Sequence, residues 1–135
     1  MDKLTPERRS ANMRAIRSKS TKPEMLVRRL VYSMGYRYRL HRKDLPGKPD
    51  LVFIGRRKVI FVHGCFWHQH SGCREGRIPN TRQDYWVPKL AGNVQRDKQN
   101  QNQLAVAGLA VMIVWECETK DVSSLKKRLE DFLTS

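Results

Sequence analysis

His63-Gly-Cys-Phe-Trp-His68-Gln-His70-Ser-Gly-Cys73 holds three of the four histidines and two of the three cysteines in this 135-residue chain. Thiolates and imidazoles at such short spacing are typical ligands of a tetrahedral zinc ion. Within the segment, Cys65-x4-His70-x2-Cys73 offers three ligands, and Cys117 is the only other cysteine that could supply the fourth. The sequence therefore predicts a structural zinc site and leaves no cysteine for a disulfide, as in a reducing cytoplasm.

The charge of the chain points to a polyanionic partner. Lysine and arginine number 27 against 13 acidic residues, for a net charge of +14, and residues 1–43 hold thirteen of the basic and three of the acidic side chains. Like charges this dense repel one another unless phosphates offset them, so nucleic acid is favoured over a merely solvated basic surface. No helix pairs the charge with a broad apolar face, which argues against a membrane surface as the partner.

Length and hydropathy predict one soluble domain. A chain of 135 residues can bury one modest core around a sheet, so we expect a single domain over residues 1–135. Residues 1–10 lack the apolar core of a signal peptide, and no apolar run approaches the length of a membrane span. We therefore expect a cytoplasmic protein.

Two helices are predicted ahead of the first strand. Thr5-Pro6 has the pattern of an N-cap and a first-turn proline, which opens a short basic helix that reaches about Arg17. Thr21-x-x-Glu24 is a capping box that opens a second helix, and Gly35 supplies its stop. The apolar face of this second helix is formed by Leu26, Val27, Leu30, Val31 and Met34.

Three strands and a hairpin are predicted next. Residues 36–41 alternate aromatic or apolar side chains with arginines, as in a strand with one wet face. Residues 51–54 and 59–62 are apolar enough to be central strands, and Gly55-Arg56-Arg57 joins them as a hairpin. The loop of histidines and cysteines begins where the second of these strands ends.

The C-terminal third is predicted as helix, strand and helix. Helical spacing returns after Thr81, with Pro88 expected to kink or divide the helix before Gly108 ends it; its buried side would hold Leu90, Val94, Leu104 and Val106. Residues 109–114 form a buried strand, and Asp121 caps a last helix with an apolar face at Leu125, Leu129, Phe132 and Leu133. This order predicts an α/β (α+β) domain in three layers, with a central mixed β-sheet flanked by helices.

Asp50 is the first candidate for chemistry. Pro49-Asp50 opens one central strand, and Phe61-Val62-His63 ends its hairpin partner, so a carboxylate there could hold a hard cation near a phosphodiester. A Pro-Asp pair on its own is more often a turn residue or cap. The nearby His63 and His68 and the basic first third of the chain favour the catalytic interpretation.

The chain resembles the very short patch repair (Vsr) endonucleases, a branch of the PD-(D/E)XK nuclease superfamily that nicks DNA beside T:G mismatches. The resemblance covers nearly the whole chain and is strongest at residues 12–16, 45–50, 59–68, 93–97 and 114–117. It implies a restriction-endonuclease-like fold, with residues 1–20 as a basic arm that contacts DNA.

The resemblance implies a catalytic Mg²⁺ site at Asp50. The carboxylate of Asp50 and the backbone carbonyl of Val62 would bind the ion, and Glu24 would reach its hydration shell. Val62 replaces a threonine found in the best-known family member, but a backbone contact survives this change. Glu24 is also interpreted as a plain helix cap, and the two roles can coexist.

The resemblance also implies which residues move protons. His68 would be the general base, Asp97 would orient its imidazole or help to position the water, and His63 would contact the reacting phosphate. His68 remains an alternative zinc ligand to His70. We prefer His70 because its four-residue spacer from the first cysteine of the loop lies within zinc-site usage, although its spacing to Cys73 is one residue longer than in that member.

Mismatch recognition is assigned by resemblance to apolar wedges, since a mismatched base step costs least to unstack. These wedges are Phe66, Trp67 and Trp86 from the major groove and Met13 from the minor groove. Trp86, Lys89, Asn93 and Asp97 fall at helical spacing, so one helix face could present all four. Core packing is the alternative for Trp86.

The leading hypothesis is a Mg²⁺-dependent, zinc-containing endonuclease that nicks one strand of double-stranded DNA beside a T:G mismatch and leaves a 5′-phosphate. The alternatives are a related nuclease with another DNA target and a non-catalytic, zinc-stabilised DNA-binding module. By resemblance we expect a bacterial, nucleoid-associated protein that could work with mismatch-repair proteins. One active site suffices to nick one strand, so we expect a monomer.

Overall fold

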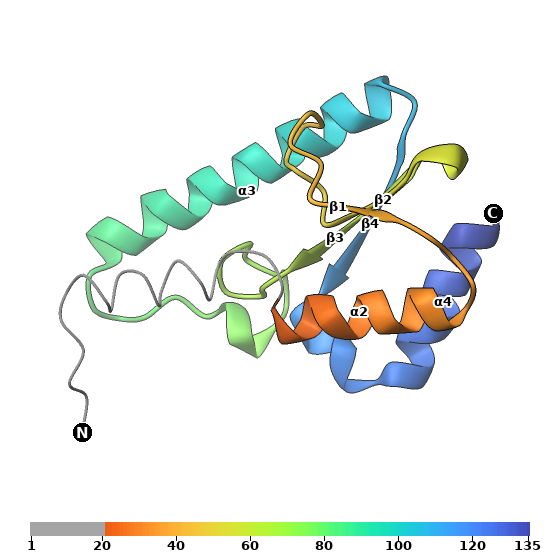
Figure 1. The fold of residues 1–135 in the computed structure, drawn as a ribbon. Coiled ribbons are helices and arrows are strands. Elements are labelled where there is room, and N and C mark those ends of the chain that lie inside the picture. Colours follow the sequence, from red (N-terminus) through yellow and green to blue (C-terminus); the bar gives the residue numbers. More distant parts are fainter. Residues whose placement is uncertain (1–20) are drawn as a thin grey trace, which may run out of the picture.

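The computed structural model describes residues 21–135, and the predicted first helix lies outside them (Figure 1). The elements in chain order are α2 (Lys22–Ser33), β1 (Arg39–Leu40), β2 (Leu51–Phe53), η1 (Ile54–Arg56), β3 (Lys58–His63), η2 (Arg74–Gly76), α3 (Gln83–Val106), β4 (Ala110–Trp115), η3 (Glu116–Lys120) and α4 (Val122–Thr134). Among the helices of the described residues, none combines the length and apolarity needed to cross a bilayer.

The four strands form one mixed sheet in the order β1-β2-β3-β4. β1 pairs with β2, and β2 with β3, in antiparallel fashion, whereas β3 and β4 are parallel. A parallel pair needs a crossover connection, and the long helix α3 provides it between β3 and β4. The predicted hairpin and mixed sheet are confirmed.

Helices cover both faces of the sheet, α3 on one side and α2 with α4 on the other (Figure 1). Side chains alternate along each strand, so Ile60 packs toward α2 and α4 while its neighbours Val59 and Phe61 pack toward α3. The larger core consists of Val27, Val31, Leu51, Phe53, Ile60, Met112, Val114, Leu125, Leu129 and Leu133. The predicted three-layer arrangement is therefore confirmed.

Local sequence signals set the ends of α2 and α4. Thr21 caps α2, its Oγ1 accepting from the backbone N–H of Glu24 at 3.4 Å, and Gly35 follows the helix at φ +94°. Asp121 caps α4, its Oδ1 accepting from the N–H of Ser124 at 3.2 Å. Both helices begin where the sequence predicts.

Two predicted elements differ from the structure. The strand expected over residues 36–41 is reduced to β1, because only two residue pairs at this sheet edge are in register with β2. The helix expected after Thr81 is not divided at Pro88, which lies inside the continuous α3. Pro88 is the sixth residue of α3, so its missing N–H removes one hydrogen bond near a free end rather than in the middle of the helix.

The prediction of which residues of α3 are buried was partly wrong. Leu90 and Leu104 are buried as predicted, and Val94 is half-buried, but Val106 is 89% exposed. Val106 is the last residue of α3, where the chain leaves the helix for Gly108 and β4. Helical spacing identifies a face, but it does not show how far along the helix the sheet extends.

Candidate active site and metal-ligand cluster

Asp50 and Val62 meet where the start of β2 lies beside the end of β3. The strands are antiparallel, with Leu51 opposite Ile60, so the residue ahead of β2 reaches the last residues of β3. The backbone N–H of Val62 donates to Oδ2 of Asp50 at 2.7 Å. This bond fixes the carboxylate at the end of the central strands.

Glu24 and His41 form a cluster with Asp50. Glu24, in the first turn of α2, is 2% exposed and is paired with Arg28. Nε2 of His41 lies 2.8 Å from Oε2 of Glu24 and 3.8 Å from Oδ1 of Asp50. One ligand atom from each of Glu24, His41 and Asp50 lies within 4.8 Å of the others, a spacing that could hold a metal ion.

Burial dominates the ionisation of Asp50. It raises the pKa of Asp50 to about 7, the charge of Glu24 adds to this rise, and the Val62 N–H and the charge of His68 oppose it. A cation bound next to this carboxylate would stabilise its ionised form and lower its pKa. His63 directly follows Val62, whose N–H donates to Asp50, and the His63 ring stacks on the His68 ring, so the His68 imidazole lies on the same side of the molecule as Asp50.

His63, His68 and Asp97 form a second group, drawn from β3, the following loop and α3. Nδ1 of His68 lies 2.6 Å from Oδ2 of Asp97, and the His63 ring stacks on the His68 ring with centroids 3.8 Å apart. Burial, reinforced by the charge of His68, lowers the pKa of His63 to about 3. His63 is therefore a neutral imidazole at physiological pH, beside an imidazole that is oriented by a carboxylate.

The third group brings together Cys65, His70, Cys73 and Cys117, whose ligand atoms all lie within 4.8 Å of one another. Nδ1 of His70 is 3.7 Å from Sγ of Cys65 and 3.4 Å from Sγ of Cys117. These are the separations expected between ligands that share one small ion, because metal–ligand bonds of about 2.0–2.3 Å leave their atoms about 3–4 Å apart. The cluster could bind a metal ion.

The pKa values of two thiols in this cluster, those of Cys65 and Cys117, favour the protonated form unless a cation offsets the thiolate charge. Burial raises the pKa of Cys65 to about 12 and also raises the pKa of Cys117. A metal ion would bind the thiolates and release these protons, so its affinity should increase with pH.

The loop backbone separates His68 from His70. Gln69, between them, has φ +52°, and its side-chain amide donates to the carbonyl oxygens of Phe66 at 2.6 Å and Gly76 at 2.9 Å. The left-handed turn directs the two neighbouring rings to different sites. His70 therefore lies with the cysteines and stacks on Trp115, while His68 lies with Asp97.

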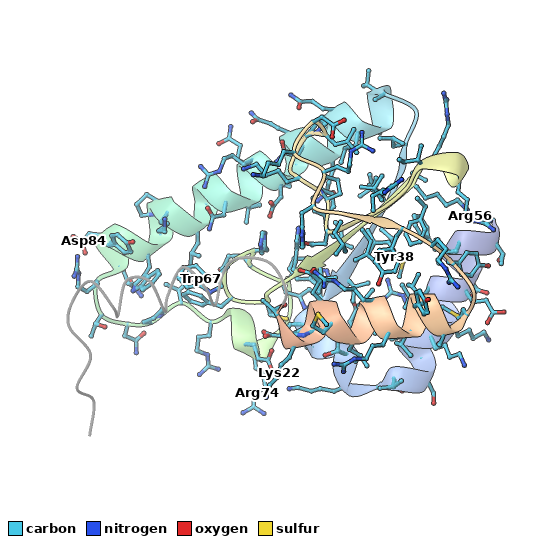
Figure 2. The ribbon with its side chains drawn as sticks, viewed as in Figure 1. Lys22, Tyr38, Arg56, Trp67, Arg74 and Asp84 are labelled. Atoms are coloured by element: carbon cyan, nitrogen blue, oxygen red, sulfur yellow. The ribbon has the colours of Figure 1, made fainter. Side chains whose placement is uncertain are left out.

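Aromatic side chains of the loop and of α3 form one cluster. Phe66 packs edge-on against Trp67 and Trp86, at centroid distances of 5.0 and 5.3 Å. Trp67 lies close to the N-terminal half of α3 (Figure 2), 5.8 Å from Trp86. Tyr85 extends the cluster toward solvent and is 45% exposed. Phe66, Trp67 and Trp86 are half-buried, so they belong to neither the core nor a fully exposed surface.

The predicted helix face on α3 turns toward this loop. The amide of Asn93 donates to the carbonyl of Trp67 at 3.0 Å, and its Oδ1 accepts from Arg96. Lys89 is half-buried on the same face, between Trp86 and Asp97 in sequence. Asn93 thus supports the loop backbone. Met13 and the basic arm of residues 1–20 lie outside the described residues.

His41 is a site residue that the sequence did not indicate. It was included in the strand expected over residues 36–41, but its role depends on register, because its backbone N–H donates to the carbonyl of Asp50 at 3.2 Å. The available signal was that His41 is the one histidine outside the 63–73 segment, nine positions ahead of Asp50.

These carboxylates and imidazoles could hydrolyse a phosphodiester, and a mixed sheet between helices is the arrangement expected of a restriction-endonuclease-like nuclease. The family model for the DNA mismatch endonuclease Vsr matches residues 1–74.

Relatives agree with this match along the whole chain. The type II nicking enzyme V.XorIIP of Xanthomonas oryzae pv. oryzae is 54% identical over 132 residues, covering 98% of this chain and 96% of the relative. V.NmeAIP, a type II nicking enzyme of Neisseria meningitidis, is 44% identical over 95% of this chain and 91% of its own length. The DNA mismatch endonuclease Vsr of Escherichia coli is 40% identical over 98% of this chain and 85% of its own length. The chain belongs to the Vsr family of DNA endonucleases.

Proposed function

We propose that this protein nicks one strand of double-stranded DNA beside a T:G mismatch in a Mg²⁺-dependent hydrolysis. The observation that supports this most strongly is the convergence of Asp50 with the His63–His68–Asp97 group at the ends of β2 and β3. Relatives named as nicking enzymes and as a mismatch endonuclease support the same activity.

The residues around Asp50 fit a hard divalent cation. The Asp50 carboxylate and the backbone carbonyl of Val62 would hold it, with Glu24 reaching it directly or through water. When bound, such an ion neutralises charge on the scissile phosphate and lowers the pKa of water. The raised pKa of Asp50 fits this role, because the buried carboxylate lacks a full counter-charge of its own.

Of the two imidazoles, that of His68 would accept a proton and that of His63 would bind the phosphate. Asp97 holds Nδ1 of His68, which leaves Nε2 to accept a proton from the attacking water. His63 is neutral and can donate a hydrogen bond to a phosphate oxygen without carrying charge into the site. The stacked rings keep the base and the phosphate contact side by side.

Zinc is the ion that we propose for the Cys65, His70, Cys73 and Cys117 cluster. Three thiols and one imidazole form a closed structural set with no position left for substrate. The ion would join the 63–76 loop to the segment after β4 and so hold His63 and His68 in place.

DNA would contact the aromatic cluster. Phe66 and Trp67 lie between Cys65 and His68 in the chain, so a side chain wedged beside the mismatch would sit next to the proposed catalytic groups. Trp86 would support the wedge from α3. Lys89, Met13 and residues 1–20 would add contacts to the backbone and minor groove. We propose a monomer in the bacterial cytoplasm, at the nucleoid, and contact with mismatch-repair proteins stays a prediction.

Replacing Asp50 tests the catalytic assignment. The wild-type protein should nick a T:G duplex with Mg²⁺ and leave the paired T:A duplex intact, and Asp50→Ala should lose the nicking but keep the binding. Asp44→Ala is the matched control, because Asp44 is an exposed carboxylate paired with Arg42 on the same loop. Equal cleavage by wild type and Asp50→Ala would reject the assignment. Binding without cleavage by both would favour a DNA-binding module, and nicking without mismatch preference would favour another DNA target.

A further inference from the structure

His41 faces both carboxylates of the cluster through one nitrogen. Its Nε2 is 2.8 Å from Oε2 of Glu24 and 3.8 Å from Oδ1 of Asp50. The side chains are enclosed, with exposed fractions of 17% for His41, 2% for Glu24 and 19% for Asp50. The imidazole therefore lies between two carboxylates rather than on the surface.

The backbone holds His41 in this position. Its N–H donates to the Asp50 carbonyl, which continues the pairing of β1 with β2 by one residue. Its φ of +47° lies in the left-handed region, which residues with a side chain adopt far less often than glycine does. The sheet edge and this turn together bring Nε2 to the cluster.

The three residues make a different donor set from carboxylates alone. Two carboxylate oxygens and one imidazole nitrogen, all within 4.8 Å of one another, could converge on a single ion. Mg²⁺ prefers oxygen ligands, whereas Mn²⁺, which also binds carboxylates, is a first-row transition ion and accepts an imidazole nitrogen more readily than Mg²⁺ does. A ligating nitrogen should therefore change which ions the site retains.

We propose that His41 is a direct ligand, through Nε2, of the divalent cation held by Asp50 and Glu24, and that it gives this site a higher affinity for Mn²⁺ than for Mg²⁺. The proposal rests on the cation site of the proposed function and adds a ligand to it. The opposing interpretation is that His41 only hydrogen-bonds Glu24 and leaves the ion to the oxygens.

Manganese binding distinguishes the two. Binding of Mn²⁺ to zinc-loaded protein is measured by the loss of the free-ion EPR signal, with Mg²⁺ affinity obtained by competition. His41→Phe keeps the ring volume and removes the nitrogen, and Arg42→Ala is the control because Arg42 pairs with Asp44 outside the cluster. We expect His41→Phe to weaken Mn²⁺ binding about tenfold or more, with a change in Mg²⁺ affinity of about threefold or less, and Arg42→Ala to change neither.

Pulsed EPR reports the ligand itself. Bound Mn²⁺ should show coupling to a ¹⁴N nucleus in wild type and Arg42→Ala, and this coupling should vanish in His41→Phe. If His41→Phe does not fold, His41→Asp provides the same test with an oxygen ligand: it should bind both ions and show no ¹⁴N coupling. Persistence of the coupling in either variant, or of the wild-type Mn²⁺ affinity in His41→Phe, would overturn the proposal.

Asp50→Asn separates this proposal from the function on which it rests. If Asp50→Asn loses Mn²⁺ while His41→Phe retains it unchanged, the cation site stands and His41 is not its ligand. If Asp50→Asn binds Mn²⁺ as well as wild type does, the cation site itself is misplaced.

Discussion

Asp50 is destabilising to the free protein for the same reason that it suits a cation. Its pKa in the folded state, about 7, lies above the ordinary 3.8 because the carboxyl is buried. Between these two pH values the folded state binds more protons than the unfolded state does. The stability that the protonated carboxyl provides is therefore fully present below pH 3.8 and is lost as the pH rises to about 7.

Asp50→Asn should therefore stabilise the protein at pH 8 in buffer without added divalent cation. The amide cannot ionise yet can still accept from the Val62 N–H, and a pKa shift of this size corresponds to at most about 4 kcal/mol. Thermal unfolding should show a higher Tm for the variant at pH 8 and equal Tm values near pH 4. Mg²⁺ should narrow the gap by stabilising only wild type. Asp44→Asn, at an exposed carboxylate, serves as the control, and equal Tm values for Asp50→Asn and wild type at pH 8 would contradict the prediction.

At the scale of the elements, the loop of residues 63–76 depends most on contacts with other parts of the chain. It contains one short 3₁₀ turn, a left-handed Gln69 and isolated turn hydrogen bonds, so its shape depends on the cysteine cluster and on Asn93. Cys117 ties the loop to the 3₁₀ segment after β4.

Cys117→Ser should open this cluster. A three-ligand site should release zinc, and the loss should lower the Tm by about 10 °C or more, corresponding to about 3 kcal/mol. Zinc content by mass spectrometry and thermal unfolding measure the two effects. Thr119→Ala is the control, because it removes a nearby hydrogen bond to the Glu116 carbonyl without touching the cluster. Full zinc occupancy in Cys117→Ser would remove that residue from the site.

The elements also show which features the sequence could predict. Caps at Thr21 and Asp121 act through residues three positions away, so the starts of α2 and α4 are local properties. The length of β1, the continuity of α3 at Pro88 and the position of His41 depend on partners far along the chain. A local pattern has no information about such register.

At the scale of the whole molecule, α3 would join recognition to catalysis if the proposed function is right. The helix carries Trp86 at the aromatic cluster and Asp97 at the group with His63 and His68, and Asn93 between them holds the Trp67 backbone. A wedge that is pushed by DNA would thus act on the same rigid helix that orients His68. We therefore expect insertion of the wedge at a mismatch to be coupled to alignment of His68, the proposed general base.

Phe66→Ala tests this coupling. Removing the ring should reduce discrimination between T:G and T:A duplexes more than it reduces total DNA binding. The reason is that a wedge must unstack a base step, which costs a few kcal/mol, and a mismatched step costs least to unstack. Binding and single-turnover nicking of both duplexes measure the effect, with an expected loss of about tenfold in the T:G preference. Tyr32→Ala is the control, since Tyr32 is a 57% exposed aromatic on α2. Equal losses on both duplexes would mean that Phe66 packs the loop rather than entering the DNA.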